Sequence, residues 1–186
     1  MAAHIMIDIE TLGTRPDAAI GALAAVHFDP ATGEALDTFE ARINVAESLI
    51  EGFSADAATL AFWRRQLRDA RTQVTTGRAH PREALEGLCR WLDGIARPDE
   101  RIVWANGAGF DPVIVETHLN HFGLDAPWRW WNVRDLRTLR ALAREAGLSL
   151  PVRPAELPEH QALADAIWQS RQTAWLLSAL RMEQAA

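Results

Sequence analysis

The first quarter of the chain consists of short apolar runs separated by turn residues, a pattern typical of strands. We expect a buried strand at residues 4–8 and a longer one at 19–28, which ends in the turn sequence Asp-Pro-Ala-Thr-Gly. Along residues 35–43 apolar and polar side chains alternate, so that Phe39 and Ile43 share one face of a third strand. These three segments predict an antiparallel meander.

Apolar residues at helical spacing follow the meander. Ser54 or Asp56 could cap a first helix, and Pro81 stands where a second helix would begin. The apolar stripe of the first helix would consist of Leu60, Trp63, Leu67 and Ala70. The stripe of the second would consist of Leu85, Leu88, Leu92 and Ile95.

Beyond residue 100 short strands alternate with helices. We expect a strand at 102–105. A helix should follow that begins at Asp111-Pro112 and ends at Gly123. A strand-like segment at 130–132 leads into a helix at 133–146.

Three prolines indicate that residues 149–159 form a loop, and a last helix is expected over residues 160–182. A meander followed by alternating strands and helices implies an α/β fold, in which helices cover a mixed five-stranded sheet. The length of 186 residues and the lack of an internal repeat or a low-complexity tract predict a single domain over residues 1–186.

Composition narrows the functional classes. Cys89 is the only cysteine, which excludes a disulfide framework and a cysteine zinc cluster and fits a reducing, cytoplasmic setting. No segment has the form of a signal peptide or of a membrane span. The formal net charge of −6 argues against a protein that coats nucleic acid non-specifically. Because metal ions can supply local positive charge, a metal-dependent enzyme stays open.

Asp8 and Glu10 stand at the end of the first predicted strand. Side chains two residues apart on a strand point to the same face, so the pair forms half of a candidate divalent-metal site. Carboxylate oxygens on a rigid element suit Mg²⁺ or Mn²⁺. The Asp-x-Glu pattern is common by chance, and its interpretation depends on further ligands elsewhere in the chain.

Three further polar residues each have two interpretations. Asp111, before Pro112, is either a helix N-cap or a ligand. Asp165 is either a solvated acid on a helix surface or a ligand. His160 is either a surface residue or part of the same site. It can share a site with Asp165 only at a loop–helix junction, because residues five apart lie well off one helical face.

In their order and context these residues resemble the motifs of the DEDDh 3′–5′ exonucleases, a family of the ribonuclease-H-like superfamily. Asp8 and Glu10 lie in Asp-Ile-Glu-Thr-Leu-Gly, and Asp111 ends Asn-Gly-Ala-Gly-Phe-Asp. His160 and Asp165 bound the sequence His-Gln-Ala-Leu-Ala-Asp. The resemblance covers nearly the whole chain.

One branch of the superfamily is most similar, because it shares segments like residues 104–106 and 127–135 and a helix motif like Thr59, Trp63 and Gln66. This branch contains phage exonuclease A-type enzymes and a mycobacterial-type 3′–5′ exoribonuclease.

The resemblance implies hydrolysis of phosphodiester bonds from a 3′ end, with release of nucleoside 5′-monophosphates. Two divalent cations, Mg²⁺ or Mn²⁺, would be held by Asp8, Glu10, Asp111 and Asp165, with Asp8 bridging them. His160 would be the general base, and its place after a proline-rich loop suggests that it swings in when substrate and metal bind.

Substrate contacts are expected on two loops. Thr11, Leu12 and Gly13 would lie under the terminal nucleotide, with Leu12 against a base, although an ordinary tight turn explains the same residues. Asn106 and Phe110 could help to hold the terminal sugar and base, although Phe110 fits the core equally well.

Two other groups of residues have a structural and a functional interpretation. The arginines of the first predicted helix form either a solvated face or a phosphate track; they are Arg64, Arg65, Arg68 and Arg71. Most tryptophans fit the core. Of the adjacent Trp130 and Trp131 we expect one to face inward and one outward, where it could contact a partner.

The expected partner is a single-stranded RNA or DNA 3′ end. The sequence does not decide between them, because discrimination requires a contact to the 2′-hydroxyl; we favour RNA. The alternatives are an endonuclease or a nuclease limited to short oligonucleotides on the same scaffold, and a catalytically silent nucleic-acid-binding module. Relatives are often homodimers, which leaves a homodimer open.

Overall fold

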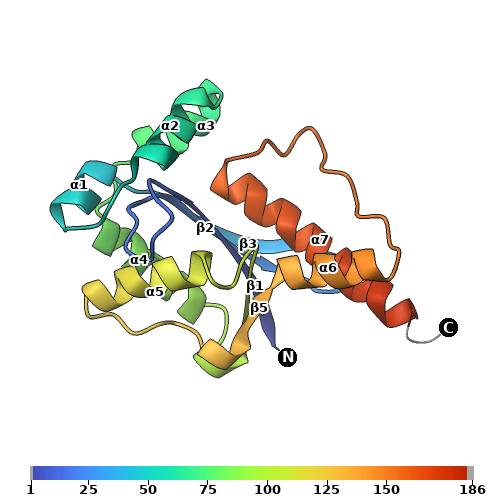
Figure 1. Ribbon diagram of the computed structural model, residues 1–186. Coiled ribbons are helices and arrows are strands. Elements are labelled where there is room, and N and C mark those ends of the chain that lie inside the picture. Colours follow the sequence, from blue (N-terminus) through green and yellow to red (C-terminus); the bar gives the residue numbers. More distant parts are fainter. Residues whose placement is uncertain (1, 184–186) are drawn as a thin grey trace.

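A central sheet with helices on both faces forms the framework of the computed structural model, which describes residues 2–183 (Figure 1). The strands are β1 (Ala3–Thr11), β2 (Ile20–Phe28), β3 (Ala35–Arg42), β4 (Arg101–Ala105) and β5 (Val133–Asp135). Their order is β3-β2-β1-β4-β5. The first three pair antiparallel, whereas β4 pairs parallel with β1 and β5 parallel with β4. The predicted mixed five-stranded sheet is confirmed.

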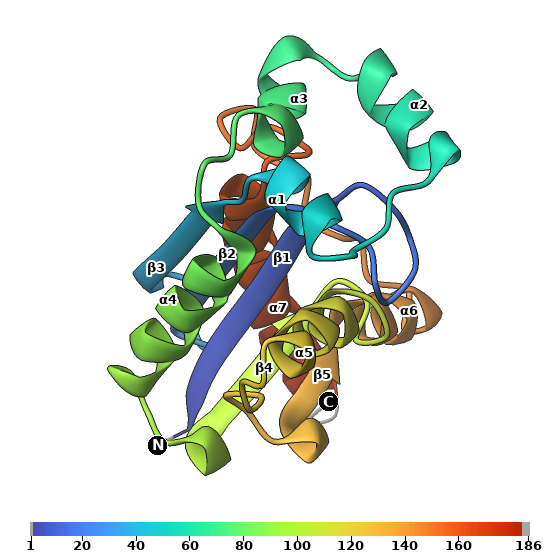
Figure 2. The same cartoon turned by 90° about the vertical axis from the view of Figure 1, so that its left-hand side faces the viewer.

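Helices cover both faces of the sheet. The α-helices are α1 (Val45–Ile50), α2 (Ala57–Arg65), α3 (Arg68–Thr75), α4 (Pro81–Asp93), α5 (Asp111–His121), α6 (Leu136–Glu145) and α7 (Ala162–Glu183). Long α7 packs across β1 and β2 on one face, and α6 lies against α7. Helices α4 and α5 cover the opposite face (Figures 1 and 2).

Strand β1, the middle strand of the sheet, is buried on both faces because helices cover both sides of the sheet. Ile5, Ile7 and Ile9 belong to the core under α4 and α5, whereas Met6 belongs to the core under α6 and α7. With a period of two, Asp8 and Glu10 continue the face of Met6. The two carboxylates therefore point to the side on which α7 crosses the sheet.

The helix expected around Trp63 is in fact two helices, α2 and α3. The backbone of Gln66 is extended, with ψ 159°, which ends α2, and Leu67 is 83% exposed instead of packing in a stripe. Trp63 is buried and its indole donates a hydrogen bond to the Thr11 carbonyl at 2.8 Å. The expected single arginine face is wrong as well, because α2 carries Arg64 and Arg65 whereas α3 carries Arg68 and Arg71.

The segment expected to be strand-like at 130–132 is a 3₁₀ turn (Trp130–Asn132) that precedes β5. Trp130 is 77% and Trp131 55% exposed, so the expectation that one of them faces inward is wrong. Only a strand places neighbouring side chains on opposite faces. The following helix begins at Leu136, three residues later than expected, where the Asp135 side chain caps it.

The carboxyl ends of the parallel strands β1, β4 and β5 lie at one edge of the sheet, and the chain leaves this edge toward α5 and α6. In open α/β sheets ligands bind outside such an edge. Within residues 2–183 no helix is both long enough and apolar enough to cross a membrane.

Candidate active site

Three carboxylates meet at the end of β1. One oxygen each of Asp8, Glu10 and Asp165 lies within 4.8 Å of the others. Asp8 and Glu10 are each only 9% exposed, and Asp165 lies in the first turn of α7, where this helix crosses β1. Residues far apart in the sequence are thus brought together by the packing of one helix on the central strand.

Asp111 lies beside this group. It is the first residue of α5, and Phe110 occupies the N-cap position, so the N-cap alternative for Asp111 is wrong. Its Oδ1 accepts a hydrogen bond from the backbone N–H of Ile9 at 3.2 Å, which ties α5 to β1. Asp111 and the three other carboxylates line one cavity of about 230 Å³.

His160 lines the same cavity from the end of the proline-rich loop. It lies two residues before α7 and its backbone has φ 60°, the left-handed conformation that non-glycine residues seldom adopt. Its ring meets Phe62 edge-on with centroids 5.1 Å apart. The loop–helix junction required for His160 and Asp165 to share a site is therefore present.

A second, larger cavity adjoins the carboxylates and shares Glu10, Phe110 and His160 with the first. It measures about 410 Å³, and its lining includes the aromatic side chains of Phe62, Trp63 and Phe110. Thr11 and Gly13 line it as well, whereas Leu12 does not: its side chain is 6% exposed and belongs to the core. The expected contact between Leu12 and a base is thus not available in this structure. We call this space the end cavity.

Burial and mutual repulsion disturb the protonation of the carboxylates. Burial, followed by the charges of Asp165 and Asp111, raises the pKa of Glu10 to about 8. Burial raises the pKa of Asp111 to about 7 against the hydrogen bond from Ile9, which lowers it. Burial and the three neighbouring carboxylates also raise the pKa of Asp8 well above its ordinary value. The ionised forms of Asp8, Glu10 and Asp111 are therefore less stable in this site than they would be in water.

A divalent cation fits this set of residues. Clustered carboxylate oxygens are the donors that hard cations such as Mg²⁺ and Mn²⁺ prefer, and a positive charge between them would offset the repulsion that raises their pKa values. The residues that would hold it are Asp8, Glu10, Asp111 and Asp165.

The sequence model of one family, the 3′–5′ exoribonuclease Rv2179c-like domain, matches residues 3–177. The chain belongs to this family. An exodeoxyribonuclease of Enterobacteria phage T4 is 26% identical over 158 residues, which cover 72% of this chain and 68% of the phage protein. The resemblance to this branch of exonucleases is confirmed, and the family places the protein among the 3′–5′ exonucleases, which are hydrolases.

Solved structures show the same fold. E. coli exonuclease I in complex with a dA16 oligonucleotide matches with a TM-score of 0.67 at 14% identity, over 96% of this chain and 41% of that one. The nuclease domain of 3′hExo, a DEDDh family member bound to rAMP, matches with a TM-score of 0.59 at 16% identity, over 96% and 92% of the chains. The ribonuclease-H-like fold is thus confirmed, and this exoribonuclease-like domain spans about two fifths of the exonuclease I chain.

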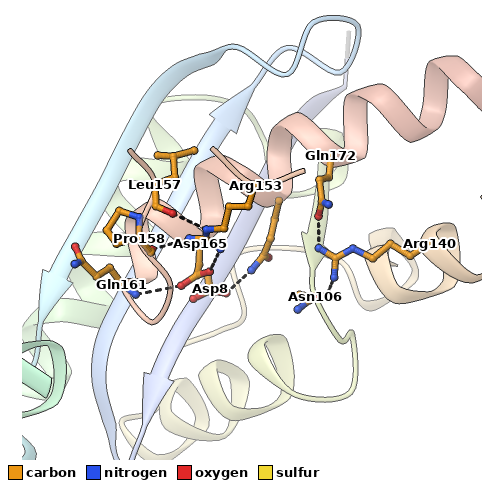
Figure 3. A network of polar contacts seen from close by, with 10 residues as sticks. Asp8, Asn106, Arg140, Arg153, Leu157, Pro158, Gln161, Asp165 and Gln172 are labelled. Atoms are coloured by element: carbon orange, nitrogen blue, oxygen red, sulfur yellow. Dashed lines mark hydrogen bonds and ion pairs between the residues drawn. The ribbon is translucent and has the colours of Figure 1, made fainter. Parts of the chain in front are cut away.

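Two residues near the carboxylates, Gln169 and Arg153, escaped the sequence analysis; Figure 3 labels Arg153 beside Asp165. Gln169 donates a hydrogen bond from Nε2 to Asp8 Oδ1 at 2.6 Å, and its position four residues after Asp165 on a helix could have revealed it. Arg153 donates to Asp165 Oδ1 at 2.5 Å and to the carbonyls of Leu157 and Pro158 at 2.5 and 2.6 Å. No local pattern marks Arg153, because it acts across a loop without regular structure.

Metal-free stability should fall as the pH rises. The folded state holds protons on Glu10 up to about pH 8, whereas the ordinary pKa is 4.5, so unfolding releases protons between these values and is favoured by high pH. We expect the melting temperature in EDTA to decrease from pH 5 to pH 8. Added Mn²⁺ should raise it, and more so at pH 8, where fewer protons compete. Glu10→Gln should flatten both responses in thermal melts; a variant that keeps them would contradict this account.

Gln169→Leu should weaken cation binding while leaving the fold intact. The change removes the amide that donates to Asp8 and stabilises its ionised form. Residues that orient metal ligands typically contribute 10- to 100-fold to affinity, so we expect about a tenfold rise in the Kd for Mn²⁺ by titration calorimetry. Gln172→Leu, on the same helix, is the matched control, because Gln172 bonds Arg140 and not a carboxylate. Equal effects of the two changes would argue against the role of Gln169.

Proposed function

We propose that this protein is a metal-dependent 3′–5′ exonuclease that shortens single-stranded nucleic acid from its 3′ end and releases nucleoside 5′-monophosphates. The observation that carries the proposal is the convergence of Asp8, Glu10 and Asp165 within 4.8 Å, next to the end cavity. Two divalent cations, Mg²⁺ or Mn²⁺, would supply charge stabilisation for both the attacking and the leaving oxygen.

The end cavity would receive the terminal nucleotide. Its volume of about 410 Å³ lies in the range of small-molecule pockets, and the aromatic rings of Phe62 and Trp63 offer apolar surface to a base. Asp56 fixes the loop beneath it, because its carboxylate accepts hydrogen bonds from the N–H groups of Thr14 and Thr59 at 3.2 and 2.7 Å. A loop fixed in this way would support a single terminal nucleotide, which favours a strand end as the substrate.

His160 would take the proton from the attacking water, since a neutral imidazole accepts protons near neutral pH. It is the one histidine that lines both the carboxylate cavity and the end cavity among the cavities of the described residues. Its expected movement on binding of substrate stays a prediction. Phe110 and Asn106, which also line the carboxylate cavity, would help to hold the terminal nucleotide.

RNA is the favoured substrate. The matching family model describes an exoribonuclease domain, and the nuclease domain of 3′hExo was solved with rAMP, a ribonucleotide. The phage relative is named an exodeoxyribonuclease and exonuclease I was solved with a deoxyoligonucleotide, so DNA is the second candidate.

The test is digestion of 5′-labelled RNA and DNA of the same sequence, single-stranded, duplex and with 3′ overhangs, in Mg²⁺, Mn²⁺ or EDTA. We expect a ladder that shortens from the 3′ end of single strands, RNA faster than DNA, and no cleavage in EDTA. Internal cuts would indicate an endonuclease, and cleavage confined to the shortest strands would indicate an oligonucleotide-specific enzyme.

His160→Ala should lower kcat by about 10²- to 10⁴-fold, the usual contribution of a general base, while the Kd for Mn²⁺ changes little. Asp8→Asn should abolish both cleavage and Mn²⁺ binding. His121→Ala is the matched control: this exposed histidine of α5 contacts Glu51 and lines none of these cavities. Full activity of the Asp8 variant would overturn the metal mechanism.

A further inference from the structure

Three arginines lie along one side of α6 in a protein whose formal net charge is −6. Arg137, Arg140 and Arg144 are spaced three and four residues apart, which places them on one helical face. Together with Asn106 they line a cavity of about 370 Å³. We call this space the arginine groove.

The arginine groove opens into the carboxylate cavity. Asn106 and Arg137 line both spaces, and Asn106 follows directly after β4. A further cavity of about 350 Å³ is shared by Arg140, Asp165 and His160 and joins the same region from the side of α7. The three cavities therefore adjoin one another between the carboxylates and α6. The end cavity lies elsewhere, because neither Asn106 nor any arginine of α6 lines it.

The protein offsets the positive charge of the groove only in part, through the nearby carboxylates of Asp135 and Asp111. Within the part of the chain whose side chains are described, none of the three arginines forms an ion pair with a carboxylate. Arg137 donates to the Asn106 carbonyl at 2.6 Å. Arg140 donates to the Asn106 side chain at 2.6 Å and to Gln172 on α7, contacts that Figure 3 shows. Its buried Nε has no hydrogen-bond partner.

The three guanidinium groups also act on one another. Burial and the charges of Arg137 and Arg144 lower the pKa of Arg140, which reports that cations are held close together. Arg140 is half-buried and fixed by its neutral partners, whereas Arg137 and Arg144 are exposed. An anion in the groove would relieve this repulsion, and the guanidinium fork matches the oxygens of a phosphate.

We infer that the arginine groove binds the phosphodiester backbone of the substrate strand on the 5′ side of the bond that is cut. This inference rests on the proposed function. With the terminal nucleotide in the end cavity and the scissile phosphate at the carboxylates, the rest of the strand must leave by another side. The arginine groove is lined mainly by basic side chains and would therefore receive the outgoing strand. Its residues 137–144 span about 10 Å along α6. Contacts to phosphates alone hold a strand without regard to its base sequence.

The test is binding of a fluorescein-labelled single-stranded 12-mer whose 3′-terminal linkages are phosphorothioates, in Mg²⁺ and at several KCl concentrations. Arg144→Gln should raise the Kd about fivefold at low salt and reduce the slope of log Kd against log[KCl] by about 0.7, the share of one phosphate contact on a single strand. Arg144→Lys should keep most of the slope.

Arg90→Gln is the matched control, since it removes the same charge from an exposed position of α4 on the opposite face of the sheet. It should leave the slope unchanged. If Arg144→Gln and Arg90→Gln give the wild-type slope, the inference is wrong. Turnover gives a second readout: Arg144→Gln should lower kcat/KM for a 12-mer and leave that for a dinucleotide unchanged.

The outcomes separate the two proposals. A wild-type protein that cleaves from the 3′ end but shows no effect of Arg144→Gln would retain the proposed function and lose the arginine groove. A wild-type protein that degrades none of the strands would contradict the proposed function. The slope comparison would still decide whether the groove binds phosphates, because it needs no turnover.

Discussion

Repulsion among buried carboxylates is the constraint on which the rest of this structure depends. Asp8 and Glu10 are held where they repel Asp165 and Asp111, because pairing with β2 on one side and β4 on the other fixes the backbone of β1. Hydrogen bonds from Gln169, from the Ile9 amide and from Arg153 offset part of this cost. The repulsion that these hydrogen bonds do not offset favours binding of a cation. A bound cation would supply the positive charge that stabilises phosphodiester hydrolysis.

The features that follow from short-range periodicity could be predicted from the sequence. A period of two placed Asp8 and Glu10 on one face of a strand, and Pro81 and Asp111 marked two helix starts. Features that depend on tertiary contacts could not. The Trp63 side chain donates a hydrogen bond to the end of β1, and α2 ends two residues later, at Arg65, despite an unbroken helical pattern. Arg153 reaches Asp165 across a loop for which periodicity says nothing.

The spaces beside the carboxylates differ in chemistry, and under the proposed function this difference would give the site a direction. The lining of the end cavity includes aromatic rings and a tight loop, whereas the arginine groove offers guanidinium groups that form no ion pair among the described side chains. A base suits the first and a charged backbone suits the second. Polarity of the reaction would then follow from the arrangement of surfaces around the sheet edge, without recognition of any particular base.

Arg153 connects two parts of the site: the segment just before His160, and Asp165 on α7. Its guanidinium holds the carbonyls of Leu157 and Pro158, just before His160, and at the same time an oxygen of Asp165. A shift of the segment that carries the histidine would therefore disturb the ion pair of this carboxylate, and a new partner for the carboxylate would weaken the hold of Arg153 on the segment. The position of the loop before His160 and the ion pair of Asp165 are thus coupled through one guanidinium group.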